Sequence, residues 1–171
     1  MQSDQEGGFD ACLSMRKVAI SSVMTKPVYT VGMEEELSVV ESLFTQHAIR
    51  HVPIVDMSNK LVGLISQRHL YKTRSPRKLP METGAVYGDD KIVDGDSYYE
   101  KSVLDSYILK NVMMPNPPTL KANNSLADSL KIMIEQKIGC VIIIDDIQHV
   151  VGIITRLDIM KFVYKLINQQ K

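Results

Sequence analysis

The sequence repeats itself at a fixed offset of 89 residues, without a gap. The segment 23–70 aligns with 112–159, and 11 of these 48 positions are identical. Several of the other positions exchange one apolar residue for another, as in LVGLIS at 61–66 against VVGIIT at 150–155. A gapless register of this length indicates a tandem repeat, so both copies should have the same fold.

Each copy predicts a strand, a helix, two further strands and a closing helix. In copy two, an extended piece at 118–120 precedes an amphipathic helix, which Ser125 and Asp128 begin as a capping box. A β-hairpin with a four-residue connection at 146–149 follows, and a helix over 156–168 closes the copy. The apolar residues expected on the inner face of the amphipathic helix are Leu126, Leu130, Met133 and Ile134.

Copy one repeats this pattern, with an extended piece at 27–31, a hairpin connection at 57–60 and a closing helix over 67–73. The strand–helix–strand step predicts a parallel pair with a right-handed crossover, and the hairpin adds an antiparallel strand. A unit of about 50 residues is marginal on its own. We therefore predict a mixed α/β (α+β) fold of two βαββα motifs, packed about a pseudo-twofold axis through their small sheets.

The chain is expected to divide into four parts that make one compact module. Residues 1–14 form a flexible tail, 15–73 form motif 1, 74–99 form a polar loop between the motifs, and 100–171 form motif 2. A helix at about 100–111 should lead into motif 2.

Composition and charge argue against several classes of protein. Lys plus Arg and Asp plus Glu number 20 each, so nothing indicates binding to nucleic acid or to an anionic membrane. The longest apolar run, 141–144, is too short for membrane insertion, and the N-terminus lacks the pattern of a secretory signal. Cys12 and Cys140 have no CxxC neighbour, so we predict a cytoplasmic protein without disulfides.

No pattern of catalytic or metal-ligating residues stands out. The sequence has no Walker A motif, no GxGxxG and no positioned Ser–His–Asp or Cys–His set, so we predict that the chain is not an enzyme. A predicted helix end separates His47 from His51, and no cysteine is near them, so no metal site is expected.

The stretch GIITRLDIM at 152–160 admits two compatible interpretations. Thr155 and Asp158 have the spacing of a capping box, which stabilises a helix by about 1 kcal/mol. The same carboxylate, at a helix start that follows a strand, can also accept hydrogen bonds from both hydroxyls of a ribose. One group can therefore cap the free helix and hold a sugar in a complex.

Two copies of the pattern x-G-h-h-[TS]-x-x-[DH]-h, where h is apolar, occur in order with VMT near the start of copy one and h-P-h-V-D in its middle. This combination resembles the cystathionine β-synthase (CBS) domain family over about 20–72 and 108–165. The resemblance implies a CBS pair, or Bateman module. Such pairs are regulatory sensors of AMP, ADP or ATP, and sometimes of S-adenosylmethionine, NAD species or cyclic di-AMP, and they are not usually catalytic.

The resemblance also implies a set of ligand-binding residues. Thr155 and Asp158 match the ribose-contacting positions. The segment from Met114 to Thr119 matches the part that closes the adenine pocket. The strand edge whose backbone contacts the base matches Gly139, Cys140 and Val141, and the candidates for phosphate contacts are Arg50, His51 and Arg156.

Copy one departs from the family pattern, because Ser66 stands in place of Thr155 and His69 in place of Asp158. A neutral imidazole has one donor and one acceptor nitrogen, so it cannot accept from two hydroxyls as a carboxylate does. We therefore expect a weaker or empty second site at Ser66, His69 and Thr25. Alternatively, His69 contacts phosphate instead of ribose.

Two functions are consistent with the sequence. The first is a regulatory module that senses an adenosine nucleotide, forms a homodimer and acts on an effector protein not named by the sequence, with no obligatory cofactor. The second is a ligand-free protein–protein interaction or dimerisation module, in which the capping box is purely structural.

Overall fold

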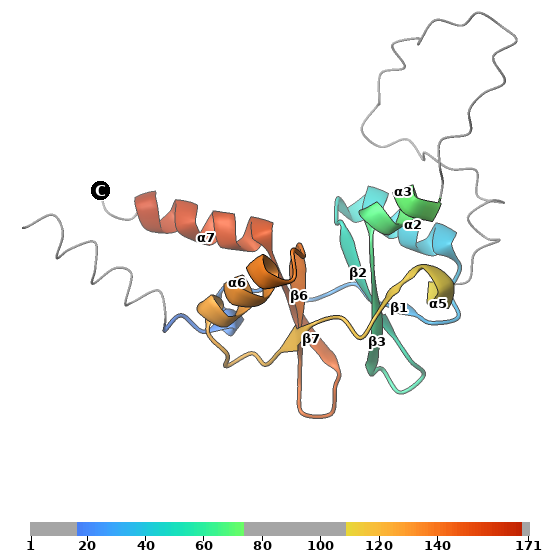
Figure 1. Ribbon diagram of the computed structural model, residues 1–171, viewed down its shortest axis with the longest axis horizontal. Helices are drawn as coiled ribbons and strands as arrows, with labels where there is room; N and C mark the ends of the chain where they lie inside the picture. Colours follow the sequence, from blue (N-terminus) through green and yellow to red (C-terminus); the bar gives the residue numbers. More distant parts are fainter. Residues whose placement is uncertain (1–16, 74–108, 169–171) are drawn as a thin grey trace, which may run out of the picture. The chain divides into compact units, whose positions relative to one another are not determined.

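The computed structural model describes residues 17–73 and 109–168, which divide into two compact units (Figure 1). Each unit combines segments from both copies. The described ranges of unit 1 are 17–28, 55–62 and 116–168, and those of unit 2 are 29–54, 63–73 and 109–115. The predicted tail at 1–14 and polar loop at 74–99 lie outside the described residues.

The predicted order of elements is confirmed in both copies. Copy one contains β1 (Val31–Gly32), α2 (Leu37–His47), β2 (His51–Val55), β3 (Leu61–Ser66) and α3 (Gln67–Thr73). Copy two contains β5 (Thr119–Leu120), α6 (Leu126–Glu135), β6 (Cys140–Ile144), β7 (Val150–Thr155) and α7 (Arg156–Asn168). Both closing helices have the predicted bounds. Each hairpin connection is one residue longer than predicted, because β2 and β6 end one residue earlier.

A short leading segment precedes each copy. Leading segment 1, residues 17–28, contains the 3-10 helix η1 (Ile20–Ser22). Leading segment 2, residues 109–117, contains α5 (Leu109–Val112) and β4 (Met114–Pro115). The helix predicted at about 100–111 is therefore seen only from Leu109 onward, since the residues before it lie outside the described part of the chain.

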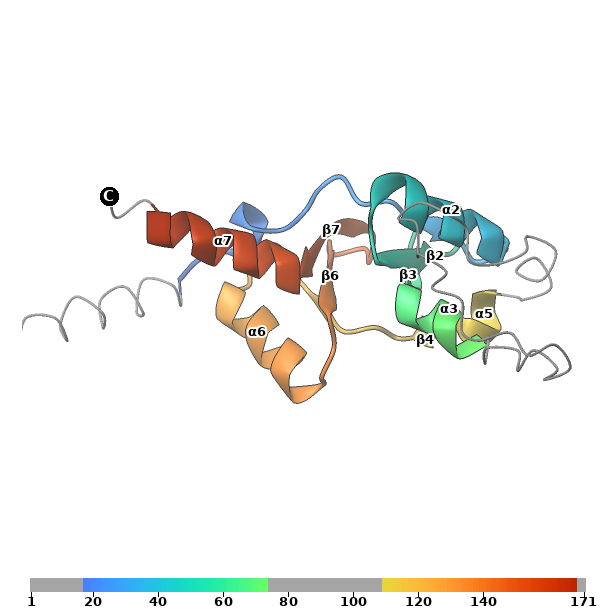
Figure 2. The same ribbon diagram turned by 90° about the horizontal axis from the view of Figure 1, so that it is seen from above.

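Unit 1 is built on the three-stranded sheet β5-β6-β7. β5 runs parallel to β6, with Thr119 opposite Ile142, and β6 runs antiparallel to β7, as predicted. Helices α6 and α7 lie on the same side of β6 and β7 in both views (Figures 1 and 2). The buried cluster beneath them consists of Ile20, Leu126, Met133, Val141, Ile143 and Ile154.

The inner face of α6 is narrower than predicted. Its buried residues are Leu126, Ser129 and Met133, which follow an i, i+3, i+7 stripe. Leu130 and Ile134 were expected in the core but are exposed, and Ile134 is 72% exposed. The reason is geometric, because a residue directly after Met133 lies about 100° further around the helix.

Each leading segment pairs with the last strand of the other copy. In unit 1, Thr25 and Ile153 exchange two backbone hydrogen bonds, of 2.9 and 3.1 Å. In unit 2, β4 joins the sheet β1-β2-β3-β4, and Met114 lies opposite Leu64 of β3. At the 89-residue offset, Thr25 aligns with Met114 and Leu64 aligns with Ile153, so the two pairs are equivalent. The last strand of each copy therefore has a backbone partner from the leading segment of the other copy.

The glycine shared by both copies, Gly63 and Gly152, lies close to a methionine of the leading segment that pairs with its strand. A Cβ atom at Gly152 would lie 2.3 Å from the sulfur of Met24. A Cβ atom at Gly63 would lie 2.3 Å from the sulfur of Met113, the equivalent residue. This close approach favours glycine at both positions, because an added Cβ atom would force the methionine side chain to shift.

Candidate functional site

Asp158 caps the N-terminus of α7 together with Thr155, as predicted. The Asp158 Oδ2 atom accepts hydrogen bonds from the Thr155 backbone N–H at 2.8 Å and from the Thr155 hydroxyl at 2.5 Å. The Asp158 backbone N–H in turn donates to Thr155 Oγ1 at 3.3 Å. The carboxylate is thereby fixed at the point where β7 ends and α7 begins.

The second carboxylate oxygen of Asp158 contacts leading segment 1. The Thr25 hydroxyl donates to Asp158 Oδ1 at 2.8 Å. The sequence analysis had grouped Thr25 with Ser66 and His69 of copy one, but its hydroxyl lies on the carboxylate of copy two. Each carboxylate oxygen accepts about two hydrogen bonds, so Oδ2 is saturated and Oδ1 retains one acceptor position. A sugar that used both its hydroxyls here would have to replace one of the present donors.

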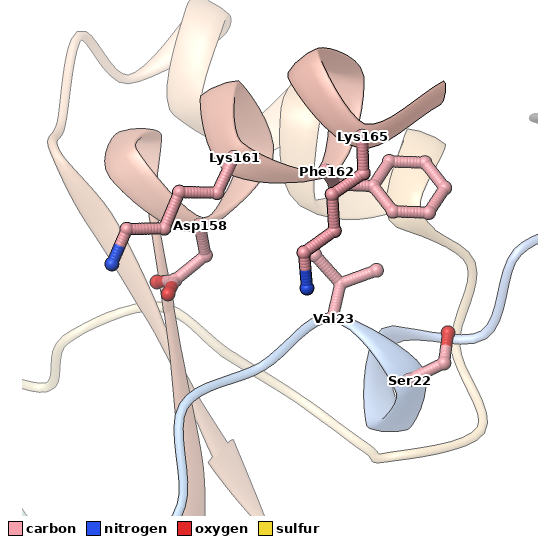
Figure 3. Close-up of a pocket in the computed structure, with 6 residues that line it drawn as sticks. All are labelled: Ser22, Val23, Asp158, Lys161, Phe162 and Lys165. Atoms are coloured by element: carbon pink, nitrogen blue, oxygen red, sulfur yellow. The ribbon is translucent and has the colours of Figure 1, made fainter. Parts of the chain in front are cut away.

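A hollow opens beside Asp158, between α7 and leading segment 1 (Figure 3). It encloses about 360 Å³ of empty space, part of it open to solvent. Asp158, Lys161 and Lys165 extend from α7 toward the segment that carries Ser22 and Val23. We call this space the α7 hollow. The residues that line it are Ser22, Val23, Asp158, Lys161, Phe162 and Lys165.

Neither lysine of the α7 hollow was among the binding residues predicted from the sequence. The signal that could have found them is their spacing, since Lys161 and Lys165 follow Asp158 at i+3 and i+7 in a predicted helix. Residues at these spacings share one face of a helix.

The predicted base-contacting edge lies at the start of β6. The Gly139 carbonyl accepts a hydrogen bond from the Arg156 backbone N–H at 3.1 Å, and Cys140 lies opposite Thr155 in the hairpin. The side chains of Cys140 and Val141 are buried, so only backbone atoms of this edge remain for a ligand. Burial raises the pKa of the Cys140 thiol to about 12, so it is protonated at neutral pH.

Two other predicted residues of unit 1 have structural contacts. Arg156 donates from Nη2 to the Ile138 carbonyl at 3.0 Å, which joins the start of α7 to the connection before β6. Its guanidinium is exposed and already has one acceptor. Thr119 lies in β5, where it pairs with Ile142.

The remaining predicted residues belong to unit 2. There, the Ser66 backbone N–H donates to His69 Nδ1 at 3.0 Å, so His69 occupies the same capping position as Asp158 does in unit 1. This contact requires an unprotonated Nδ1. The residue equivalent to Thr25 is Met114, which has no hydroxyl to donate. Arg50 accepts from the Gln67 backbone N–H at 3.1 Å through its carbonyl, and its neighbour His51 begins β2.

No group of three or more His, Cys, Asp or Glu side chains within 17–73 and 109–168 could hold a metal ion. His47 instead stacks on Tyr29, with ring centroids 4.0 Å apart. The helices in this part of the chain are all too short or too polar to cross a bilayer.

Known proteins match most of this chain. A CBS domain-containing protein of Dictyostelium discoideum is 23% identical over 151 residues, which cover 88% of this chain and 94% of that protein. The CBS domain pair of protein MJ0100, solved in complex with 5′-methylthioadenosine and S-adenosyl-L-methionine, has a TM-score of 0.64 at 21% identity and covers 85% of this chain and 99% of that chain. CBSX2, solved in complex with AMP, has a TM-score of 0.64 at 17% identity and covers 87% of this chain and 98% of that chain.

The family model described as the CBS domain matches the chain twice, at residues 20–75 and 109–165. These matches coincide with the two copies of the repeat, each with its leading segment. The chain therefore belongs to the CBS domain family and is a tandem pair of such domains.

Proposed function

We propose that this CBS pair is a non-catalytic regulatory module that senses an adenosine-containing nucleotide of the AMP, ADP or ATP type. The observation that carries this proposal is the Asp158 carboxylate, fixed by Thr155 at the start of α7 and reached by the Thr25 hydroxyl. A carboxylate held in this way is an acceptor for ribose hydroxyls, and hydrogen bonds to a charged group contribute about 1.5–3 kcal/mol each.

The ligands of related structures support the choice of an adenosine compound. The MJ0100 pair was solved with 5′-methylthioadenosine and S-adenosyl-L-methionine, and CBSX2 with AMP. All three molecules contain an adenine joined to a ribose, while their other ends differ. S-adenosylmethionine and NAD species therefore remain further candidates for this chain.

The other proposed contacts surround the sugar. The backbone at Gly139, Cys140 and Val141 contacts the base, and Thr119 and Met114 close the pocket around it. The resemblance offers Arg156, Arg50 and His51 as candidates for phosphate contacts, and of these only Arg156 belongs to the same unit as Asp158. A micromolar sensor requires about −8 kcal/mol of binding free energy. The copy-one site at Ser66 and His69 is weaker, because an imidazole accepts only one hydrogen bond.

Ligand binding acts by shifting an equilibrium between two tilts of the CBS domains, or between two dimer geometries. A ligand shifts such an equilibrium only when it binds one arrangement more tightly than the other. The altered surface is then recognised by an effector protein.

A second candidate function is a ligand-free dimerisation or protein-interaction module, and the exposed face of α7 favours it. Four large apolar residues on this face are 55–69% exposed, and they are Leu157, Met160, Tyr164 and Ile167. Successive members are three, four and three positions apart, which is the spacing of the apolar seam by which two helices pack together. The same face also supports the homodimer that we propose for the nucleotide sensor.

The experiment that tests the nucleotide sensor compares two capping boxes of the same chain. Ser125 and Asp128 cap α6 as Thr155 and Asp158 cap α7, and the Ser125 hydroxyl and backbone N–H hold the pKa of Asp128 below its usual value. Asp128→Asn is therefore the matched control for the loss of a cap, and Asp158→Asn loses the Thr25 contact in addition. Melting temperatures are measured with and without adenosine, AMP, ADP and ATP.

We expect nucleotide to raise the melting temperature of the wild type and of Asp128→Asn, but not that of Asp158→Asn. An equal shift in both variants would show that the site is elsewhere. The absence of a shift in the wild type with any of the four compounds would favour the ligand-free module.

A further inference from the structure

The α7 hollow contains two lysines whose charges are not paired within the described residues of unit 1. Lys161 and Lys165 are both exposed, and neither forms an ion pair with a residue in the described part of unit 1. Asp158 is the one acidic residue in the lining. Two ammonium groups against one carboxylate leave the hollow with a net positive charge.

Asp158, Lys161 and Lys165 occupy one face of α7. A second face packs against the core, and a third is the exposed apolar face. Ile159 and Phe162 pack against the core of unit 1, and the exposed apolar seam begins at Leu157. Asp158, Lys161 and Lys165 lie between these faces, on the side that faces leading segment 1 (Figure 3). The charge on this face is therefore needed neither for the core nor for the seam.

Along this face, the charges have a fixed order. Asp158 comes first, at the start of α7, and the lysines follow about 4.5 and 10.5 Å further along the helix axis, at a rise of 1.5 Å per residue. A nucleotide has the same order of groups, since its ribose hydroxyls are followed, across the C5′ atom, by one or more phosphates. A phosphate beside Asp158 itself would be repelled, whereas one turn later it meets an ammonium group.

We propose that Lys161 and Lys165 form the phosphate subsite of the ligand whose ribose Asp158 holds. This inference rests on the proposed function and makes it more specific. Lys161 contacts the first phosphate and Lys165 contacts a second phosphate where one is present. Among the candidate ligands, this favours a C5′-phosphorylated adenosine over the uncharged thioether 5′-methylthioadenosine and the cationic sulfonium S-adenosylmethionine.

The side chains around the lysines favour this role. Val23 and Phe162 give the hollow an apolar wall, and charges interact more strongly beside such a wall than in open water. The Ser22 hydroxyl donates to the Ala19 carbonyl at 2.7 Å, so its proton is engaged within leading segment 1. The lysines are thus the groups of the lining with ammonium protons to offer a phosphate.

The test measures binding by isothermal titration calorimetry on the full chain with adenosine, 5′-methylthioadenosine, AMP and ADP. The variants are Lys161→Gln, Lys165→Gln and the double variant, with Lys161→Arg as a charge-retaining form. Lys131→Gln, which changes an exposed lysine of α6 outside the hollow, is the matched control. Melting temperatures without nucleotide should change little in all of them, because Lys161 and Lys165 make no ion pairs with the described residues of unit 1 and Lys131 has only a charge interaction with the exposed Asp128.

We expect the wild type to bind AMP at least tenfold more tightly than adenosine or 5′-methylthioadenosine. Each Lys→Gln change should weaken phosphate-dependent binding by about tenfold. Lys161→Gln should weaken both AMP and ADP, whereas Lys165→Gln should weaken ADP more than AMP. Adenosine binding should be unaffected in every variant, and added salt should weaken AMP more than adenosine.

Equal AMP affinity in the wild type and the double variant would overturn the phosphate subsite and leave the adenosine site in place. Equal affinity of the wild type for AMP and adenosine would overturn it in the same way. A wild type that binds none of the four compounds would overturn both the subsite and the proposed function.

Discussion

The Thr25 hydroxyl donates a hydrogen bond to Asp158 Oδ1 at 2.8 Å, across 133 residues of sequence. It joins leading segment 1 to the helix cap of copy two, beside the backbone pair that Thr25 makes with Ile153. The same carboxylate is the proposed acceptor for ribose. Binding of a sugar at Asp158 would therefore change a contact that fixes leading segment 1.

Replacing Thr25 with valine separates the structural role of this contact from its role in binding. Thr25→Val should lower the free energy of unfolding by about 1 kcal/mol, because one hydrogen bond to a carboxylate is lost. It should not weaken AMP binding, since a donor that competes with ribose has been removed. Urea denaturation and calorimetry measure the two effects.

Thr25→Ser, which keeps the hydroxyl, is the control and should behave as the wild type in both measurements. A large loss of AMP affinity in Thr25→Val would contradict the competition and would place the Thr25 hydroxyl on the ligand instead.

The contact between Met24 and Gly152 predicts a large effect from a single methyl group. Gly152→Ala places a Cβ atom 2.3 Å from the Met24 sulfur, so the Met24 side chain, which packs against the core of unit 1, must shift. Overpacking of this kind costs about 1–3 kcal/mol of stability. Urea denaturation of the variant measures the loss.

Gly32→Ala is the matched control, since its new Cβ atom would be 3.7 Å from the nearest side-chain atom, Glu35 Cγ, and should change stability little. The double variant Met24→Ala, Gly152→Ala should show less than the sum of the two single losses, because the clash is absent. A Gly152→Ala protein as stable as Gly32→Ala would disprove the close packing.

Cys140 should be chemically inert in the folded protein. Its pKa is raised to about 12 by burial, so the thiol keeps its proton as the pH rises past the usual range of a cysteine. Since the thiolate is the reacting species, native protein should not react with a disulfide reagent at about pH 8. The measurement uses a Cys12→Ser background, in which reaction is expected only after denaturant is added. Stoichiometric reaction of the native protein would contradict the burial of Cys140.

Much of the fold could be predicted from the 89-residue repeat. Apolar periodicity and cap residues located the closing helices 67–73 and 156–168, because these signals are local to each helix. The faces of α6 were less well predicted, since Ile134 is apolar but exposed. The sequence shows which residues of a helix are apolar, whereas their burial depends on which side of the helix packs against the sheet.

The candidate site was only partly predictable, for a different reason. A repeat shows which residues are equivalent, but it does not show which copy a leading segment pairs with. Thr25 was therefore assigned to copy one, although its backbone pairs with β7 of copy two. Lys161 and Lys165 are ordinary lysines in the sequence, and they become notable only when α7 places them beside Asp158.

The proposed nucleotide site depends above all on Asp158 holding the hydroxyls of a ribose. The most direct measurement compares the affinities of AMP and its 2′,3′-dideoxy analogue for the wild type and for Asp158→Asn by calorimetry. We predict that removing the hydroxyls weakens binding to the wild type by at least tenfold, and that Asp158→Asn binds the two compounds with nearly equal, weak affinity. Equal affinity of the wild type for both compounds, or an undiminished preference for AMP in Asp158→Asn, would contradict the claim.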